Sequence, residues 1–275
     1  MYLIAGDSWG CGEWVHRDPS IVLDPPRGNY ELSLVHRGLA EYLEQHDTVI
    51  NISKPGAGNF DVLKQIRLFL DINYNYVPEI KKIFVFQTSW WRDFLLDYFH
   101  CWLTDNKNLH RNFEWRLEYT GLDKTKNPLL QLHIDQVDKL EYNLTTKWYN
   151  DLNFLAKDRG LEIVVIGGLA DTLPDFNDMS NLKFGCSSMV NLALSNSEYP
   201  QVASAGGFIP DELVKIVVDI CRLDKKQMLN YIDKFETRTK LLKDRLDLFP
   251  DGCHGDRECH LKVYQLLEQK GLLGL

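Results

Sequence analysis

The chain has 275 residues, of which 44% are hydrophobic and 25% charged, a composition typical of a folded protein rather than a disordered one. It carries 31 Lys and Arg against 39 Asp and Glu, a formal charge of −8 that opposes binding to nucleic acid or to anionic lipid. No run approaches the roughly 18 apolar residues of a membrane span, and the first residues lack the basic start of a signal peptide. Six dispersed cysteines then predict free thiols in a reducing compartment.

Short apolar runs alternate with amphipathic stretches along the chain. The runs that predict strands are 2–5, 48–52, 83–86 and 161–166. Apolar residues at helical spacing predict helices over 34–45, 61–73, 91–104, 136–158, 211–222, 225–247 and 257–270, with Gly160 ending the helix before it. This alternation predicts an α/β fold in which a parallel sheet is covered on both faces.

No composition break divides the chain, so we expect a single domain over 1–275. The stretches of about 94–135 and 170–247 resemble insertions into its core. In parallel sheets, functional residues gather in the loops at the carboxyl ends of the strands, which here follow residues 5, 52, 86 and 166.

The first of these loops reads Gly6-Asp7-Ser8-Trp9-Gly10. Its glycines allow a sharp turn from strand to helix, which would place the Ser8 hydroxyl near free helical N–H groups. The five residues fit the G-x-S-x-G elbow of α/β-hydrolases, although residue 8 comes too early in the chain for that fold. Ser8 is therefore either a nucleophile or a helix cap. Asp7 is expected to bond backbone groups nearby rather than to catalyse.

An aspartate and a histidine stand three residues apart near the other end of the chain, at Asp251 and His254. A serine nucleophile needs a base, and the base needs a group that holds its tautomer. Asp251 can accept the Nδ1 proton of His254, which leaves Nε2 free to face Ser8. The alternative is a solvated Pro-Asp-Gly turn beside a surface histidine. Because the two motifs are independent, their joint presence favours a triad.

On these motifs the chain resembles the SGNH, or GDSL-type, hydrolases. The resemblance rests on Gly6-Asp7-Ser8 after the first strand and on Asp251-x-x-His254 before the last helix. It is supported by the run 51–56, Asn-Ile-Ser-Lys-Pro-Gly, which follows the second strand and is similar to the family's second block. The resemblance implies a flavodoxin-like three-layer fold with about five parallel strands between helices.

The resemblance also implies roles for single residues. Ser8 would be the nucleophile, His254 the general base and acid, and Asp251 the orienting carboxylate. The backbone N–H groups of Ser8 and Gly56 would stabilise the oxyanion, with Gly58 as the second choice for Gly56. The family requires no cofactor or metal for this chemistry.

One block of the family pattern is missing. The third block, Gly-x-Asn-Asp, supplies an asparagine to the oxyanion hole, whereas the loop here runs from Gln87 through Thr88, Ser89 and two tryptophans to Arg92, without an asparagine. A hydroxyl from Ser89 or Thr88 is the candidate replacement, Ser89 being slightly favoured, and local bonding of these hydroxyls to the backbone is the equal alternative. Losing such a donor costs roughly a hundredfold in rate.

Aromatic residues in the first and third loops are candidates for substrate contact. Trp9, Trp14 and Trp90 would suit a sugar ring or an acyl chain, or would simply pack in the core. Arg92 would bind an anionic substrate group or pair with a carboxylate, such as that of Glu13. The run that holds Cys253, His254, Cys259 and His260 does not have the spacing of a zinc site, and His260 is expected to pack on the sheet.

The sequence therefore predicts a serine esterase that removes an acyl group, most simply acetyl, from a carbohydrate or a similar small ester. Two alternatives stay open: a lipid esterase or thioesterase on the same triad, and a binding or structural module, for example of a phage particle. The expected location is cytoplasmic or virion-associated, and the sequence does not indicate an oligomeric state.

Overall fold

The computed structural model describes residues 1–16, 32–88, 134–168, 170–172, 179–195, 242 and 244–274. Its centre is a sheet of five parallel strands in the order β4-β1-β5-β6-β7. These strands are Tyr2–Ala5 (β1), Val49–Asn51 (β4), Lys82–Gln87 (β5), Ile163–Gly167 (β6) and Leu182–Cys186 (β7). Numbered along the chain, this is the order 2-1-3-4-5 of flavodoxin-like folds, which confirms the predicted fold class.

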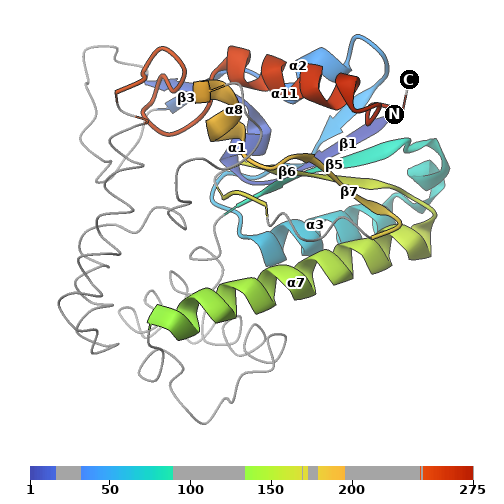
Figure 1. The fold of residues 1–275 in the computed structure, drawn as a ribbon. Helices are drawn as coiled ribbons and strands as arrows, with labels where there is room; N and C mark the ends of the chain where they lie inside the picture. Colours follow the sequence, from blue (N-terminus) through green and yellow to red (C-terminus); the bar gives the residue numbers. More distant parts are fainter. Residues whose placement is uncertain are drawn as a thin grey trace, which may run out of the picture.

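Helices cover both faces of the sheet (Figure 1). Leu39–Leu43 (α2), Met189–Ser195 (α8) and Arg257–Gln269 (α11) pack on one face, and Asn59–Ile72 (α3) and Ile134–Arg159 (α7) on the other. Tyr74–Glu79 (η1) is a 3₁₀ helix that leads into β5. Because strand side chains alternate, each strand contributes to two cores. Ile4, Phe86 and Ile166 are buried beneath α11, whereas Ala5, Val85 and Val165 are buried on the side of α3 and α7.

Most predicted elements are present within a few residues of their expected bounds. The strand runs 2–5, 48–52, 83–86 and 161–166 correspond to β1, β4, β5 and β6, and the helices over 61–73, 136–158 and 257–270 correspond to α3, α7 and α11. Gly160, which ends α7, has a φ of 64°, a left-handed conformation that glycine adopts without strain.

One predicted helix is wrong over its first half. Residues Leu32–His36 form a strand (β3) that pairs antiparallel with Glu13–His16 (β2), and only Leu39–Leu43 of the predicted helix 34–45 is helical. The spacing of the apolar residues wrongly indicated a helix, because Leu34 and Val35 are exposed strand residues rather than part of a helical face. Gly38, with a φ of 59°, separates the strand from α2.

Strand β7 was not predicted, because it lies in a stretch too rich in polar and small residues to stand out. The predicted helices 91–104 and 211–222 lie outside the described residues, as does most of 225–247, whose end at 244–247 forms a turn. The proposed insertions 94–135 and 170–247 also lie largely outside them. Within the described ranges, no helix is long and apolar enough to cross a membrane.

Helix α11 carries a histidine into the core, in the position expected for packing on the sheet. His260 is fully buried, its ring lies 5.9 Å from that of Phe86, and neither ring nitrogen has a hydrogen-bond partner of ordinary geometry. Burial, reinforced by the nearby His36 and His254, lowers the pKa of His260 to about 3. The folded protein therefore keeps this side chain neutral well below the ordinary histidine pKa of 6.5.

This buried histidine predicts a stability that falls in acid. Between pH 6.5 and about 3 the unfolded chain binds a proton at residue 260 that the folded chain excludes. The free energy of unfolding should therefore decrease by up to about 1.4 kcal/mol per pH unit as the pH falls through this window. His260→Leu should show a smaller decrease than the wild type between pH 6.5 and 4 in urea unfolding. Equal slopes for wild type and His260→Leu would contradict this account.

Candidate active site

The turn after β1 brings Ser8 to the carboxyl edge of the sheet. A Cβ on Gly6 would come within 2.8 Å of the Phe86 Cβ, so glycine is needed where β1 passes β5. Asp7 then caps the short helix Ser8–Cys11 (α1), because its Oδ1 accepts the N–H of Trp9 at 2.9 Å. Ser8 is the first residue of this helix and is only 6% exposed.

Asp7 is anchored from the neighbouring strand as well. The Thr88 hydroxyl donates to Asp7 Oδ2 at 2.6 Å. Thr88 is itself held by Asn59, whose side chain accepts the Thr88 N–H at 3.0 Å and donates to the Thr88 carbonyl at 2.7 Å. Asp7, Asn59 and Thr88 are all completely buried. This network fixes the turn that carries Ser8 against the ends of β5 and α3.

The base and its carboxylate come from the loop that precedes α11. Asp251 Oδ1 accepts the N–H groups of Cys253 at 2.9 Å and His254 at 2.7 Å, and Oδ2 contacts His254 Nδ1 at 2.5 Å. Gly252 allows the tight turn with a φ of 71°. Asp256 then caps α11 by accepting the N–H of Cys259 at 2.9 Å. The loop is thus rigidly joined to the helix that packs on the sheet.

The ionisation of Asp251 follows from these contacts. Burial alone would raise the pKa of this carboxyl, but the hydrogen bonds from the His254 side chain and from the two backbone N–H groups outweigh it and lower the pKa below the ordinary value. An ionised Asp251 cannot donate, so Nδ1 of His254 carries the proton that lies between them. Nε2 is then left as an acceptor.

This acceptor faces the serine. His254 Nε2 lies 2.7 Å from Ser8 Oγ, although the two residues are 246 positions apart in the sequence. The structure therefore brings Ser8, His254 and Asp251 into one hydrogen-bonded chain. Each of the three side chains is buried, with residue exposures of 6%, 8% and 6%. Such a chain can remove the proton of the serine hydroxyl and hold it on the imidazole.

The N–H groups predicted for the oxyanion differ in their availability. Those of Ser8 and Gly56 make no hydrogen bond within the described part of the chain. The Gly58 N–H, in contrast, faces Asp61 Oδ2 at 3.4 Å, at the start of α3. Gly56 has a φ of 78° and open space around its Cα. Ser8 and Gly56 remain the predicted donors.

The hydrogen bonds of Thr88 reduce the number of candidates that could replace the missing asparagine. The Thr88 hydroxyl donates to Asp7, so it is already used and is not available to an oxyanion. Ser89, the other candidate, lies outside the described residues. Asn59 has an amide side chain close to this edge, but both ends of that amide bind the Thr88 backbone. Sequence reasoning missed both this use of Asn59 and the Asp7–Thr88 contact, because neither belongs to a motif.

The aromatic candidates fall into three groups. Trp9 is only 1% exposed and packs against Phe249 and His254, so its ring offers almost no surface to a substrate. Trp14 is half-buried and lies beside His254. Trp90 and Arg92 lie outside the described residues. The carboxylate of Glu13, a predicted partner of Arg92, forms an ion pair with Arg257.

The cysteines and histidines between residues 253 and 260 do not form one site, because each has different contacts. Cys259 Sγ donates to the Leu248 carbonyl at 3.4 Å, and burial raises the pKa of this thiol well above its ordinary value. His254 contacts Asp251 and Ser8, whereas His260 lies in the core. Among the residues that the structure describes, no three side chains of histidine, cysteine, aspartate or glutamate are grouped as a metal site requires.

Comparisons with known proteins do not identify a family for this chain. No family model and no curated protein matches the chain. Among solved structures, an acetylxylan esterase from Geobacillus stearothermophilus is similar at 10% identity and a TM-score of 0.34, over 100% of this chain and 94% of that one. A likeness at this level does not establish a family or an activity.

The anchoring of Asp7 predicts a measurable loss when the threonine hydroxyl is removed. Thr88→Val keeps the shape of the side chain but takes a donor from a buried carboxylate. The free energy of unfolding should fall by about 1–3 kcal/mol, measured by urea denaturation. Thr146→Val is a matched control, because its hydroxyl bonds the Tyr142 carbonyl on the exposed side of α7, and it should change stability by less than about 0.5 kcal/mol. Similar losses in both variants would contradict a specific role for the Asp7 contact.

Proposed function

We propose that this chain is a serine esterase of the SGNH type, which removes an acyl group, most simply acetyl, from a carbohydrate or a similar small ester. The observation that carries the proposal is the unbroken hydrogen-bonded chain from Ser8 Oγ through His254 to Asp251. The alternatives for each motif, a helix cap and a solvated turn, do not require these side chains to meet. Their meeting across 246 positions is what an activated serine requires.

The first half of the reaction forms an acyl-enzyme. Ser8 Oγ attacks the acyl carbonyl carbon while His254 Nε2 takes the hydroxyl proton, and Asp251 stabilises the imidazolium that results. The negative charge moves to the carbonyl oxygen, where the N–H groups of Ser8 and Gly56 are the proposed donors. The carbon–oxygen bond to the alcohol then breaks, and the alcohol leaves with the proton from His254.

The second half releases the acid. A water molecule attacks the acyl carbon while His254 Nε2 accepts its proton, and the tetrahedral intermediate again places charge on the carbonyl oxygen. Collapse of this intermediate breaks the ester bond to Ser8, whose oxygen takes the proton back from His254. Serine, histidine and aspartate thus return to their starting states, with no group needed beyond those of the chain and water.

A second candidate is supported by the site itself. Thr88 is bound to Asp7 and so does not replace the missing third-block asparagine, which leaves Ser89 as the candidate. Without a donor from Ser89, the site would be that of a slow enzyme or of a module that only binds its ligand. A lipid esterase or thioesterase on the same triad is the third candidate. A series of esters and thioesters of increasing acyl length separates it from an acetyl esterase.

Labelling with a fluorophosphonate tests the proposal. The intact protein should be labelled at Ser8, because the probe reacts with a serine that has an adjacent base. Ser8→Ala should abolish labelling, and His254→Ala should slow it at least about a thousandfold. Ser180→Ala, at a serine whose hydroxyl bonds Asn181 away from the triad, is the matched control and should label like the wild type. A folded wild type that stays unlabelled would contradict the proposal.

The role of Asp251 predicts a separate effect on turnover. Asp251→Asn removes the acceptor that holds the proton on His254 Nδ1, so the imidazole is free to present its N–H to Ser8 instead. The hydrolysis rate of 4-nitrophenyl acetate at neutral pH should fall by about 10⁴-fold, with the fold retained by circular dichroism. A loss of less than tenfold would show that Asp251 does not orient the base.

A further inference from the structure

A second tryptophan contacts both the serine and the histidine of the proposed triad. The indole N–H of Trp14 donates to the Ser8 carbonyl at 2.9 Å. The ring of Trp14 also lies 6.0 Å from that of His254, at an angle of 44°. The buried Trp9 lies at the same distance from His254, at 54°. His254 is therefore packed against two indole rings, one of which is tied to the nucleophile.

The position of Trp14 depends on an unusual start to β2. Gly12 has a φ of 132°, and a Cβ there would come within 2.1 Å of the His36 carbonyl oxygen. Only glycine allows the chain to pass β3 so closely. The pairing of β2 with β3 then shifts between Glu13 and Trp14, an irregularity of the kind that redirects side chains.

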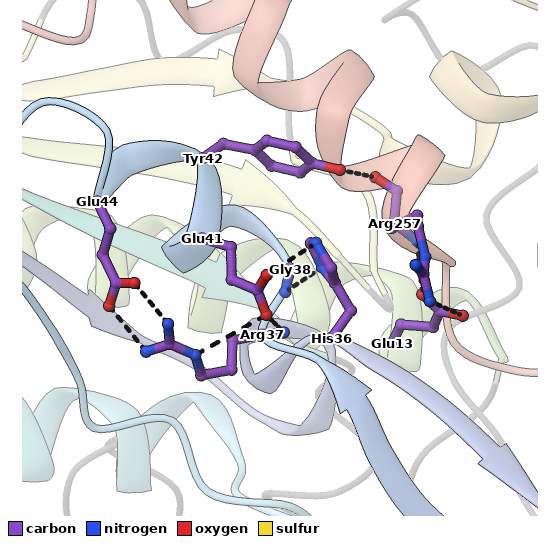
Figure 2. A network of polar contacts seen from close by, with 8 residues as sticks. All are labelled: Glu13, His36, Arg37, Gly38, Glu41, Tyr42, Glu44 and Arg257. Atoms are coloured by element: carbon purple, nitrogen blue, oxygen red, sulfur yellow. Dashed lines mark hydrogen bonds and ion pairs between the residues drawn. The ribbon is translucent and has the colours of Figure 1, made fainter.

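An ion pair fastens this segment to α11. Glu13 is only 6% exposed, and its carboxylate accepts the Arg257 side-chain Nε–H at 2.9 Å and the Arg257 backbone N–H at 3.2 Å. Tyr42 of α2 donates to the Arg257 carbonyl at 2.9 Å. Figure 2 shows these contacts meeting at the first residue of α11, which follows His254 by three positions. The residue before Trp14 is thus bound to the segment that carries the base.

We propose that Trp14 is a positioning residue for Ser8 and His254, and that the Glu13–Arg257 ion pair holds it in place; this inference rests on the proposed function. The hydrogen bond to the Ser8 carbonyl fixes the peptide that follows the nucleophile. The ring limits the rotation of the His254 imidazole. When His254 takes the serine proton, a positive charge develops beside two indole rings, whose electron-rich faces stabilise cations.

Three variants at these residues separate the parts of this role. Trp14→Phe keeps a ring beside His254 but loses the hydrogen bond, and should slow fluorophosphonate labelling of Ser8 on the order of fivefold. Trp14→Leu loses both contacts and should slow it on the order of thirtyfold. For 4-nitrophenyl acetate, both variants should lower kcat while KM changes by less than about twofold, because Trp14 is argued to act through the catalytic groups. Glu13→Gln should lower kcat by about threefold, because it weakens the ion pair that holds Trp14 in place.

The control comes from a neighbouring ion pair of the same kind. Arg37 binds Glu44 through two hydrogen bonds on the outside of α2 (Figure 2). The hydrogen bonds of Ser8, His254 and Asp251 involve neither of these residues. Arg37→Gln should label and turn over like the wild type. All rates are measured at least 15 °C below each variant's own melting temperature, so that unfolding does not contribute to them.

The outcomes distinguish this inference from the function on which it rests. The positioning role would be supported if Trp14→Phe lowers the labelling rate and kcat, Trp14→Leu lowers them further, and Arg37→Gln leaves both unchanged. A labelled wild type with equally labelled Trp14 variants would overturn the role of Trp14 and leave the esterase proposal intact. A rise in KM with constant kcat would overturn it too, because it would place Trp14 at the substrate. An unlabelled wild type would overturn both.

Discussion

The hydrogen bond between His254 Nε2 and Ser8 Oγ, 2.7 Å long, is the contact on which the account depends. It joins the first turn of the chain to the last loop, and it requires the whole sheet to be in place. Strand β1 lies between β4 and β5, and the Ser8 turn follows its carboxyl end. Helix α11 packs on the face that holds Ile4 and Phe86, and so returns His254 to the same edge. The geometry of the candidate site therefore depends on the packing of α11, because a shift of this helix would separate the base from the serine.

Two buried carboxylates, Asp7 and Asp251, hold the loops of the candidate site in place through hydrogen bonds. Asp7 receives the Trp9 N–H and the Thr88 hydroxyl, and Asp251 receives two backbone N–H groups and the His254 imidazole. A buried carboxylate is costly unless such donors surround it, so each of these networks fixes its own loop in a single geometry. The two carboxylates have different roles. Asp7 holds the nucleophile turn against β5, whereas Asp251 sets the tautomer of the base. The aromatic rings of Trp9 and Trp14 complete the enclosure of His254.

The sequence predicted the features that depend on local patterns and missed those that depend on distant contacts. Strand β5 was predictable from its continuous apolar run and helix α11 from the helical spacing of its apolar residues. Ser8, Asp251 and His254 stood out because they lie in short motifs. The hairpin of β2 and β3 was not predictable, since Leu34 and Val35 are apolar yet exposed, and their spacing imitated a helix. The pairing of Glu13 with Arg257 was missed as well, because it links residues 244 positions apart and belongs to no motif. Thr88 was considered as an oxyanion donor, and only the structure shows that its hydroxyl binds Asp7.

Trapping the covalent intermediate tests the central claim most directly. The protein is mixed with an excess of 4-nitrophenyl acetate, quenched in acid within the first turnover, and analysed by mass spectrometry of the intact chain and its peptides. The account predicts a mass increase of one acetyl group, located on Ser8, that appears with a burst of nitrophenol and is absent in Ser8→Ala. Acetyl found only on lysines or on the N-terminus, with Ser8 unmodified and no burst, would contradict it. The hydrogen-bonded chain would then have a structural role, and the site would be one that binds without catalysing.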